Sequence, residues 1–214
     1  MRFQLWDEAV TIITANVRRD PNGEKIGQYP PGTRLVVTGG PVERADLTWW
    51  QVRNGFTGWV AEDAPNGAVL LDKWDGSSFG RAMRFVLSVE GGYLSAEEAA
   101  EIGDMGGATR WGIAQKFNPQ VNVATMELDQ CKRIYQEKYW QPVGGDELPW
   151  PLALTVFDMA VNAGIGTALR LLNEAGPDFA KYNEHRRAYY RSLKQFDVFG
   201  NGWLNRVDAI EKFA

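Results

Sequence analysis

Glu90 is the residue of this chain with the clearest opportunity for acid–base chemistry. Residues 79–89 before it carry apolar side chains at helical spacing, which predicts an amphipathic helix capped by Ser77 or Ser78. Gly91 is the residue type expected just beyond a helix end, with a positive φ angle. Glu90 would then lie at the negative end of the helix dipole among apolar neighbours, and both effects favour the protonated carboxyl of a general acid. The alternative is a solvated charge at a helix end. The apolar face would consist of Phe79, Met83, Val86 and Val89.

A second candidate stretch, residues 104–113, contains an aspartate, two adjacent glycines and a threonine. The glycines predict a turn, across which Thr109 can aim its hydroxyl. If this loop faces Glu90 across a groove, Asp104 and Thr109 lie opposite the acid. That arrangement suits inverting cleavage of a glycosidic bond, in which one carboxyl protonates the leaving oxygen and the opposite side orients water. A plain surface turn is the alternative, and Asp104 would then order the loop without acting as a base.

Candidate substrate contacts flank these two stretches. The aromatic residues Tyr93, Trp111, Tyr139 and Trp140 could stack on sugar faces, although aromatic residues at helix ends are often part of the core. Asp158 and Asn162 are four residues apart and share a helix face. Polar residues on an inward face favour a buried network, with a groove contact through Asn162 as the alternative. A solvated helix face is predicted for the basic cluster Arg186, Arg187, Arg191 and Lys194.

Composition restricts the other kinds of chemistry. The chain has one cysteine and one histidine, too few for a disulfide framework or a zinc site of the usual type, so we expect no metal and no cofactor. A cysteine peptidase would need an activated Cys131, but its spacing with Leu128 and Tyr135 predicts a small buried side chain. The net charge of −4 offers no general case for nucleic-acid binding. No apolar run is long enough for membrane insertion, and the acidic N-terminus lacks the apolar core of a signal peptide.

The pattern of residues changes along the chain. Residues 1–72 contain short β-branched runs separated by turn signals, of which Asn54-Gly55 is the strongest hairpin signal, and they predict a small all-β barrel. At least two of the aromatic side chains Tyr29, Trp49, Trp50 and Trp59 are expected in its core, with a ligand platform as the alternative. Residues 73–78 are a short polar linker, and residues 79–214 show helical patterns. The last helix is expected to begin at Asn201.

The first part resembles the bacterial SH3-type domain. The resemblance rests on Ala15-Asn16-Val17-Arg18, Ile26-Gly27, Pro31-Gly32-Thr33, Trp50-Gln51-Val52-Arg53 and Gly58-Trp59-Val60-Ala61. It covers nearly the whole of residues 1–72 and implies a module that binds cell-wall peptides or docks onto its neighbour.

The second part resembles glycosyl hydrolase family 108, whose members are muramidases with a lysozyme-like helical fold. The motifs are Glu90-Gly91-Gly92-Tyr93, Asp104-x-Gly106-Gly107-Ala108-Thr109-x-x-Gly112-Ile113, Tyr139-Trp140, Phe157-Asp158-Met159-Ala160-Val161-Asn162-Ala163-Gly164, Arg187-x-x-Tyr190 and Phe199-x-x-Gly202-Trp203-x-x-Arg206-Val207. The resemblance implies that Glu90 is the catalytic acid. The resemblance defines the roles of Asp104 and Thr109 less closely than that of Glu90. The segment between Tyr93 and Asp104 departs from the pattern, being rich in Glu and Ala.

These observations predict a two-domain protein, a small all-β SH3-like barrel followed by a mainly α lysozyme-like domain. The resemblance implies an endolysin-like N-acetylmuramidase that cleaves the β-1,4 bond between N-acetylmuramic acid and N-acetylglucosamine in bacterial peptidoglycan. A phage endolysin would be made in the host cytoplasm as a monomer and act on the wall after release. A lytic transglycosylase acting on the same bond and a non-catalytic wall-binding or secretion-assisting protein are the alternatives.

Overall fold

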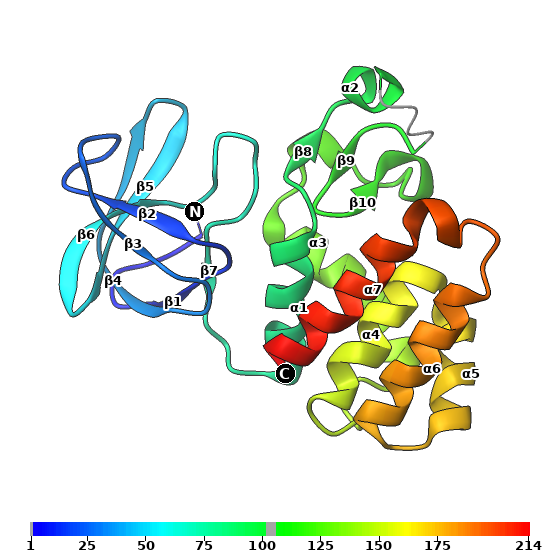
Figure 1. Cartoon of the computed structure of the whole chain (residues 1–214). Helices are drawn as coiled ribbons and strands as arrows, with labels where there is room; N and C mark the ends of the chain where they lie inside the picture. Colours follow the sequence, from blue (N-terminus) through cyan, green and yellow to red (C-terminus); the bar gives the residue numbers. More distant parts are fainter. Residues whose placement is uncertain (1, 102–105) are drawn as a thin grey trace. The chain divides into compact units, whose positions relative to one another are not determined.

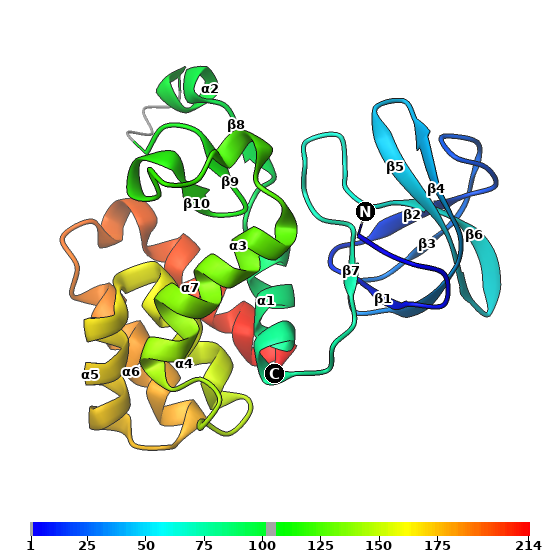
Figure 2. The same ribbon diagram turned by 180° about the vertical axis from the view of Figure 1, so that it is seen from behind.

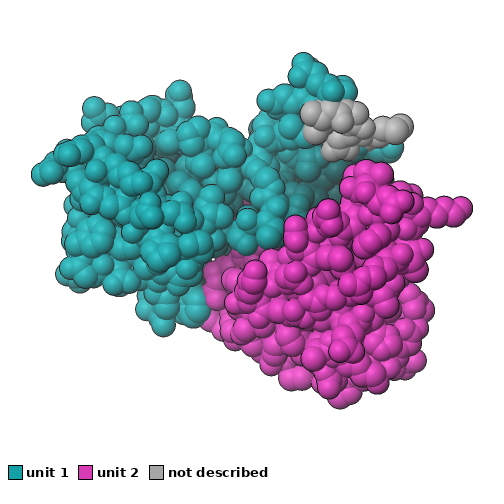
Figure 3. Space-filling view, in the orientation of Figure 1, with its two compact units in different colours: residues 1–75, 87–127 teal, residues 76–86, 128–214 magenta. Residues whose placement is uncertain are grey.

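The computed structural model describes residues 2–101 and 106–214. The chain forms two compact units, shown in different colours in Figure 3. Unit 1 comprises Met1–Asp75 and Leu87–Glu127, and unit 2 comprises Gly76–Val86 and Leu128–Ala214. The domain boundaries expected at residues 72 and 79 stay a prediction.

Unit 1 begins with an antiparallel β-sheet (Figure 1). Its strands are β1 (Glu8–Thr11), β2 (Ala15–Arg18), β3 (Lys25–Tyr29), β4 (Arg34–Arg44), β5 (Leu47–Asn54), β6 (Phe56–Ala61) and β7 (Leu71–Lys73). Their order in the sheet is β3-β2-β6-β5-β4-β1-β7. Every one of these strands contributes at least one buried side chain to a single core. The sheet must therefore curve around that core, and the all-β prediction for this part of the chain is confirmed.

Aromatic side chains and a tight turn stabilise this sheet. Gly55 has φ +73° and joins β5 to β6, as the Asn54-Gly55 pair predicts. Tyr29, Trp49 and Trp50 are at most 5% exposed, so the prediction of a core role for at least two of the aromatic residues is confirmed. The indole of Trp50 donates a hydrogen bond of 2.6 Å to the carboxylate of Glu62. This bond satisfies the one polar atom of a buried ring.

A smaller sheet completes unit 1. It contains β8 (Tyr93–Leu94), β9 (Thr109–Arg110) and β10 (Ile113–Ala114) in the order β10-β9-β8. The short helix α2 (Ala96–Glu101) begins with a capping box, in which the Ser95 amide donates to Glu98 at 2.8 Å and the Glu98 amide donates to Ser95 Oγ at 3.2 Å. The pattern Ser95-Ala96-Glu97-Glu98 is typical of a capping box and predicts a short helix through Ile102. The helix after Ser95 is confirmed, and Ile102 lies outside the described residues. Two 3₁₀ turns follow, η1 (Gln115–Phe117) and η2 (Val123–Thr125).

Unit 2 is helical, which confirms the mainly α prediction for the second part of the chain. Its elements are α1 (Ser78–Val89, with its last turn in unit 1), α3 (Leu128–Tyr135), the π-helical turn η3 (Gln136–Trp140), the 3₁₀ turn η4 (Gln141–Val143), α4 (Leu152–Ala163), α5 (Ile165–Ala175), α6 (Phe179–Arg191) and α7 (Phe196–Phe213). Residues 152–160 of α4 are all buried, so α4 is the central helix. Helices α5 and α6 pack beside α4, as Figures 1 and 2 show from opposite sides.

The start of α7 differs from the expectation. The helix begins at Phe196 rather than at Asn201, because Gly200 lies in a helical turn and does not break it. A Cβ atom at Gly200 would lie 2.5 Å from the ring of Phe196. The glycine therefore provides space for an aromatic ring one turn earlier. A pattern of local propensities cannot distinguish this role from a helix break.

Candidate active site

Glu90 directly follows the last residue of α1 and is partly buried. Ser77 caps the helix, because its Oγ accepts a hydrogen bond of 2.9 Å from the amide of Gly80. The predicted apolar face is correct for Met83 and Val86, but Val89 is 42% exposed. Ala82, Phe85 and Leu87 are also buried, so the buried surface of this helix is wider than the predicted stripe. Because the side chains of α1 are largely buried, the helix fixes the position of the backbone at Glu90.

The glycines after Glu90 have roles that differ from the prediction. The φ angle of Gly91 is not in the positive region, so the expected helix-ending conformation is wrong. A Cβ atom on Gly91 would meet no atom within 4 Å. A Cβ atom on Gly92 would collide with the carbonyl oxygen of Asn66 and lie 2.6 Å from the amide nitrogen of Ala68. The second glycine is thus required by a close approach of two backbone segments.

Strand pairing brings the second candidate stretch next to this turn. In the smaller sheet Tyr93 pairs with Arg110 and Leu94 pairs with Thr109. The Trp111 amide donates a hydrogen bond of 3.0 Å to the Gly92 carbonyl, which extends the pairing towards Glu90. The Thr109 hydroxyl donates to the Gly107 carbonyl at 3.1 Å, confirming that it points back across the turn. Asp104 lies outside the described residues.

The aromatic candidates near Glu90 differ in exposure. Tyr93 is 38% exposed, whereas Trp111 is 2% exposed. The Trp111 ring contacts the guanidinium of Arg110, whose Cζ lies 4.4 Å from the ring centroid. Arg110 also donates a hydrogen bond of 2.8 Å to the carbonyl of Ala124. Arg110 was not identified from the sequence, because no motif distinguishes a surface arginine from one that stabilises a hairpin.

The three remaining candidates, Tyr139, Trp140 and Asn162, belong to unit 2. Trp140 is fully buried, so it is a core residue and does not contact a sugar. Tyr139 is partly buried and packs against Tyr135, with ring centroids 5.9 Å apart, and burial raises the pKa of its phenol. Asn162 is exposed, and its amide donates to the Asp158 carbonyl at 2.8 Å. The structure therefore brings Glu90, Tyr93, Thr109 and Trp111 together in unit 1 and places Tyr139 and Asn162 in unit 2.

A buried ionic network lies in the core of unit 2. Asp158 is fully buried and accepts hydrogen bonds from Arg186 at 2.7 Å and from Arg206 at 2.9 Å. This arrangement confirms the predicted network around Asp158. It also shows that the solvated helix face is wrong for Arg186, which is fully buried, although Arg187 next to it is only partly so. A run of basic residues does not reveal which member faces the core.

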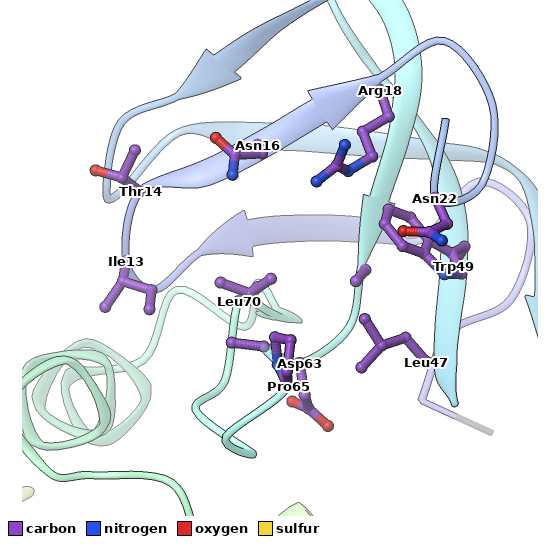
Figure 4. A pocket seen from close by; sticks show the side chains of 12 residues that line it. Ile13, Thr14, Asn16, Arg18, Asn22, Leu47, Trp49, Asp63, Pro65 and Leu70 are labelled. Atoms are coloured by element: carbon purple, nitrogen blue, oxygen red, sulfur yellow. The ribbon is translucent and has the colours of Figure 1, made fainter. Parts of the chain in front are cut away.

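A pocket of about 300 Å³ is a second candidate site in unit 1. Figure 4 shows Asn16 and Arg18 of β2 on one side, with Leu47, Asp63 and Leu70 on the other. Arg18 donates a hydrogen bond of 2.7 Å to the carbonyl of Gly23, and its Cζ lies 5.9 Å from the ring centroid of Trp49. Asp63 is paired with Arg2 at 2.9 Å. The pocket therefore offers amide, cationic and apolar groups to a ligand.

Residues 2–101 and 106–214 lack two further features. In that part of the chain, no group of three or more His, Cys, Asp or Glu side chains is arranged to hold a metal ion. Over the same residues, no helix has the length and apolar character needed to span a membrane.

Comparisons with known proteins bear on the region around Glu90. The family model described as Glycosyl hydrolase 108 matches residues 83–164, a range that contains every candidate site residue named above except those of the pocket. Among solved structures, the chain is similar to the structure of Brucella abortus SagA, at 27% sequence identity and a TM-score of 0.53. The match covers 64% of this chain and 93% of that one. No curated protein matches the chain. These findings support a glycoside hydrolase, while the SH3-type resemblance of residues 1–72 stays a prediction.

Proposed function

We propose that this protein is an endolysin-like N-acetylmuramidase with Glu90 as its general acid. The family match supports peptidoglycan hydrolysis in general, and the proposal specifies the β-1,4 bond between N-acetylmuramic acid and N-acetylglucosamine. The observation that carries it is the position of Glu90. Glu90 is partly buried at the end of α1. After it the chain enters β8, which pairs with β9, the strand that contains Thr109.

Cleavage would proceed by protonation of the leaving oxygen from the Glu90 carboxyl. Water would attack the anomeric carbon from the opposite face, oriented by Thr109, and the Asp104 carboxylate would accept the proton that this water loses. The Thr109 hydroxyl donates its hydrogen bond to the Gly107 carbonyl. The lone pairs of the hydroxyl oxygen can therefore accept a hydrogen bond from that water. Tyr93 is assigned to contact a sugar ring because it is exposed, and Tyr139 and Asn162 stay candidate contacts.

The decisive experiment compares Glu90→Gln with the wild type on purified peptidoglycan. Loss of a general acid lowers the rate by about 10²–10⁴-fold. Glu97→Gln is the matched control, since Glu97 is an exposed carboxylate in the first turn of α2 and should digest as fast as the wild type. If Glu90→Gln releases muropeptides at the wild-type rate, the assignment of the acid is wrong.

The products separate the alternatives. Reducing ends in released muropeptides support hydrolysis, whereas 1,6-anhydro ends would identify a lytic transglycosylase that uses Glu90 without an activated water. A wild-type protein that binds the wall and releases nothing would identify a binding or secretion-assisting protein.

We also propose that the pocket beside β2 binds peptidoglycan, since Arg18 can pair with a carboxylate of a wall peptide. Arg18→Ala should then weaken sedimentation of the protein with purified wall. In this proposal the protein acts as a monomer, is made in the cytoplasm of a phage-infected host and reaches the wall after release.

A further inference from the structure

A tight turn follows β6 in unit 1, and its backbone is well fixed. It is here called the 64–68 turn. The bridge between Asp63 and Val69 closes its base, and the Ala64 amide donates to the Ala68 carbonyl at 2.8 Å. Gly67 adopts φ +76°, a conformation that other residues rarely take. The Asn66 side chain accepts a hydrogen bond of 3.2 Å from the Ala68 amide. Local bonds thus define the shape of the turn.

The 64–68 turn contacts both segments of the candidate active site in unit 1. The Asn66 carbonyl accepts a hydrogen bond of 3.0 Å from the Tyr93 amide. The Gly67 carbonyl accepts one of 2.8 Å from the indole nitrogen of Trp111. Gly92 lies so close that a Cβ atom there would collide with Asn66. These contacts join residues that are 26 to 44 positions apart in the sequence, within one compact unit (Figure 3).

We propose that the 64–68 turn positions Glu90 for catalysis, so that residues of the N-terminal β-sheet module form part of the active-site scaffold. The inference rests on the proposed role of Glu90 as the acid. Glu90 is held on one side by α1 and on the other by Gly92, two residues away. Two residues of backbone span at most about 7 Å. The close contact between Gly92 and the Asn66 carbonyl therefore restricts where the Glu90 carboxyl can lie. A displacement of about 1 Å can cost about 10²-fold in rate.

This role gives Trp111 a function different from sugar stacking. Its ring is buried, and its N–H bond to Gly67 joins the turn to the β9–β10 hairpin. Trp111 is therefore assigned as a positioning residue. The same turn continues from Asp63, which lines the pocket of Figure 4, so one short segment borders both candidate sites.

Two variants in the full-length chain test the proposal. Gly92→Ala adds a methyl group that collides with Asn66, and Trp111→Phe keeps an aromatic ring but removes the N–H donor. With solubilised glycan strands as substrate, both should lower kcat about 10-fold or more and change KM by less than about twofold, because positioning affects the transition state rather than ground-state binding. A sugar contact through Trp111 would instead raise KM.

Amide hydrogen exchange supplies a readout that does not depend on activity. Exchange at the Tyr93 amide should be faster in both variants and unchanged in Gly91→Ala, the matched control, whose added methyl group has open space. If Gly92→Ala and Trp111→Phe keep wild-type kcat while Glu90→Gln is inactive, the positioning role is wrong and the proposed function stands. If Glu90→Gln is itself active, the proposed function fails instead.

Discussion

Replacing Asp158 by alanine tests how the helical unit is held together. The Asp158 carboxylate is fully buried between α4, α6 and α7 and accepts hydrogen bonds from both Arg186 and Arg206. Burial opposes the charge on Arg186, but attraction from Asp158 and interactions with Tyr190 outweigh it, so the pKa of the guanidinium is raised. An arginine side chain keeps its proton inside proteins, so Arg186 stays charged when Asp158 is removed.

The size of the effect follows from burial. Arg186 has no exposed side-chain surface, so the variant leaves an uncompensated charge inside the core. Breaking such a pair costs about 3–5 kcal/mol. One kcal/mol corresponds to about 2–4 °C in Tm for a protein of this size, which gives a loss of about 6–20 °C.

The control uses the neighbouring arginine on the same helix. Arg187 pairs with Asp208 at 2.6 Å and with Glu211 at 2.8 Å, but these carboxylates are 51% and 38% exposed. Arg187→Ala should therefore cost about 1 kcal/mol or less.

Urea unfolding followed by the helical circular dichroism signal measures both variants. Adding Arg186→Met to Asp158→Ala should restore part of the lost stability, because the unpaired charge is then absent. Equal losses in Asp158→Ala and Arg187→Ala would refute this reasoning, since burial would then not distinguish the two networks.

Two further outcomes are expected. A hydrogen bond from Arg187 lowers the pKa of Glu211 below its ordinary 4.5, so this pair contributes stability above that pH and loses it as the pH falls through the lower folded value. Glu211→Gln should consequently reduce the acid sensitivity of thermal unfolding, and an unchanged slope between neutral and acid pH would contradict the assignment. Cys131 is buried on α3, so Cys131→Ala should digest peptidoglycan at close to the wild-type rate, whereas abolished digestion would favour a cysteine peptidase.

Interactions between residues close in sequence were predictable. The Ser77 cap, the capping box of Ser95 and Glu98, and the turn at Gly55 all form as their residue types indicate. Each involves a bond or a backbone angle within a few positions, so the side chains needed are visible in the sequence itself. The same holds for the change from strand to helix patterns near residue 78.

The sequence by itself therefore determined these caps and this turn, the two-part architecture and the glutamate that follows α1, but not the start of α7 or the conformation of Gly91. Only the tertiary structure decided which neighbours those residues meet. It buried Arg186 and left Arg187 partly exposed, and it made Gly92 necessary through the carbonyl of Asn66. The physical reason is that burial and close backbone approach depend on segments distant in sequence, and one-dimensional patterns do not record those contacts.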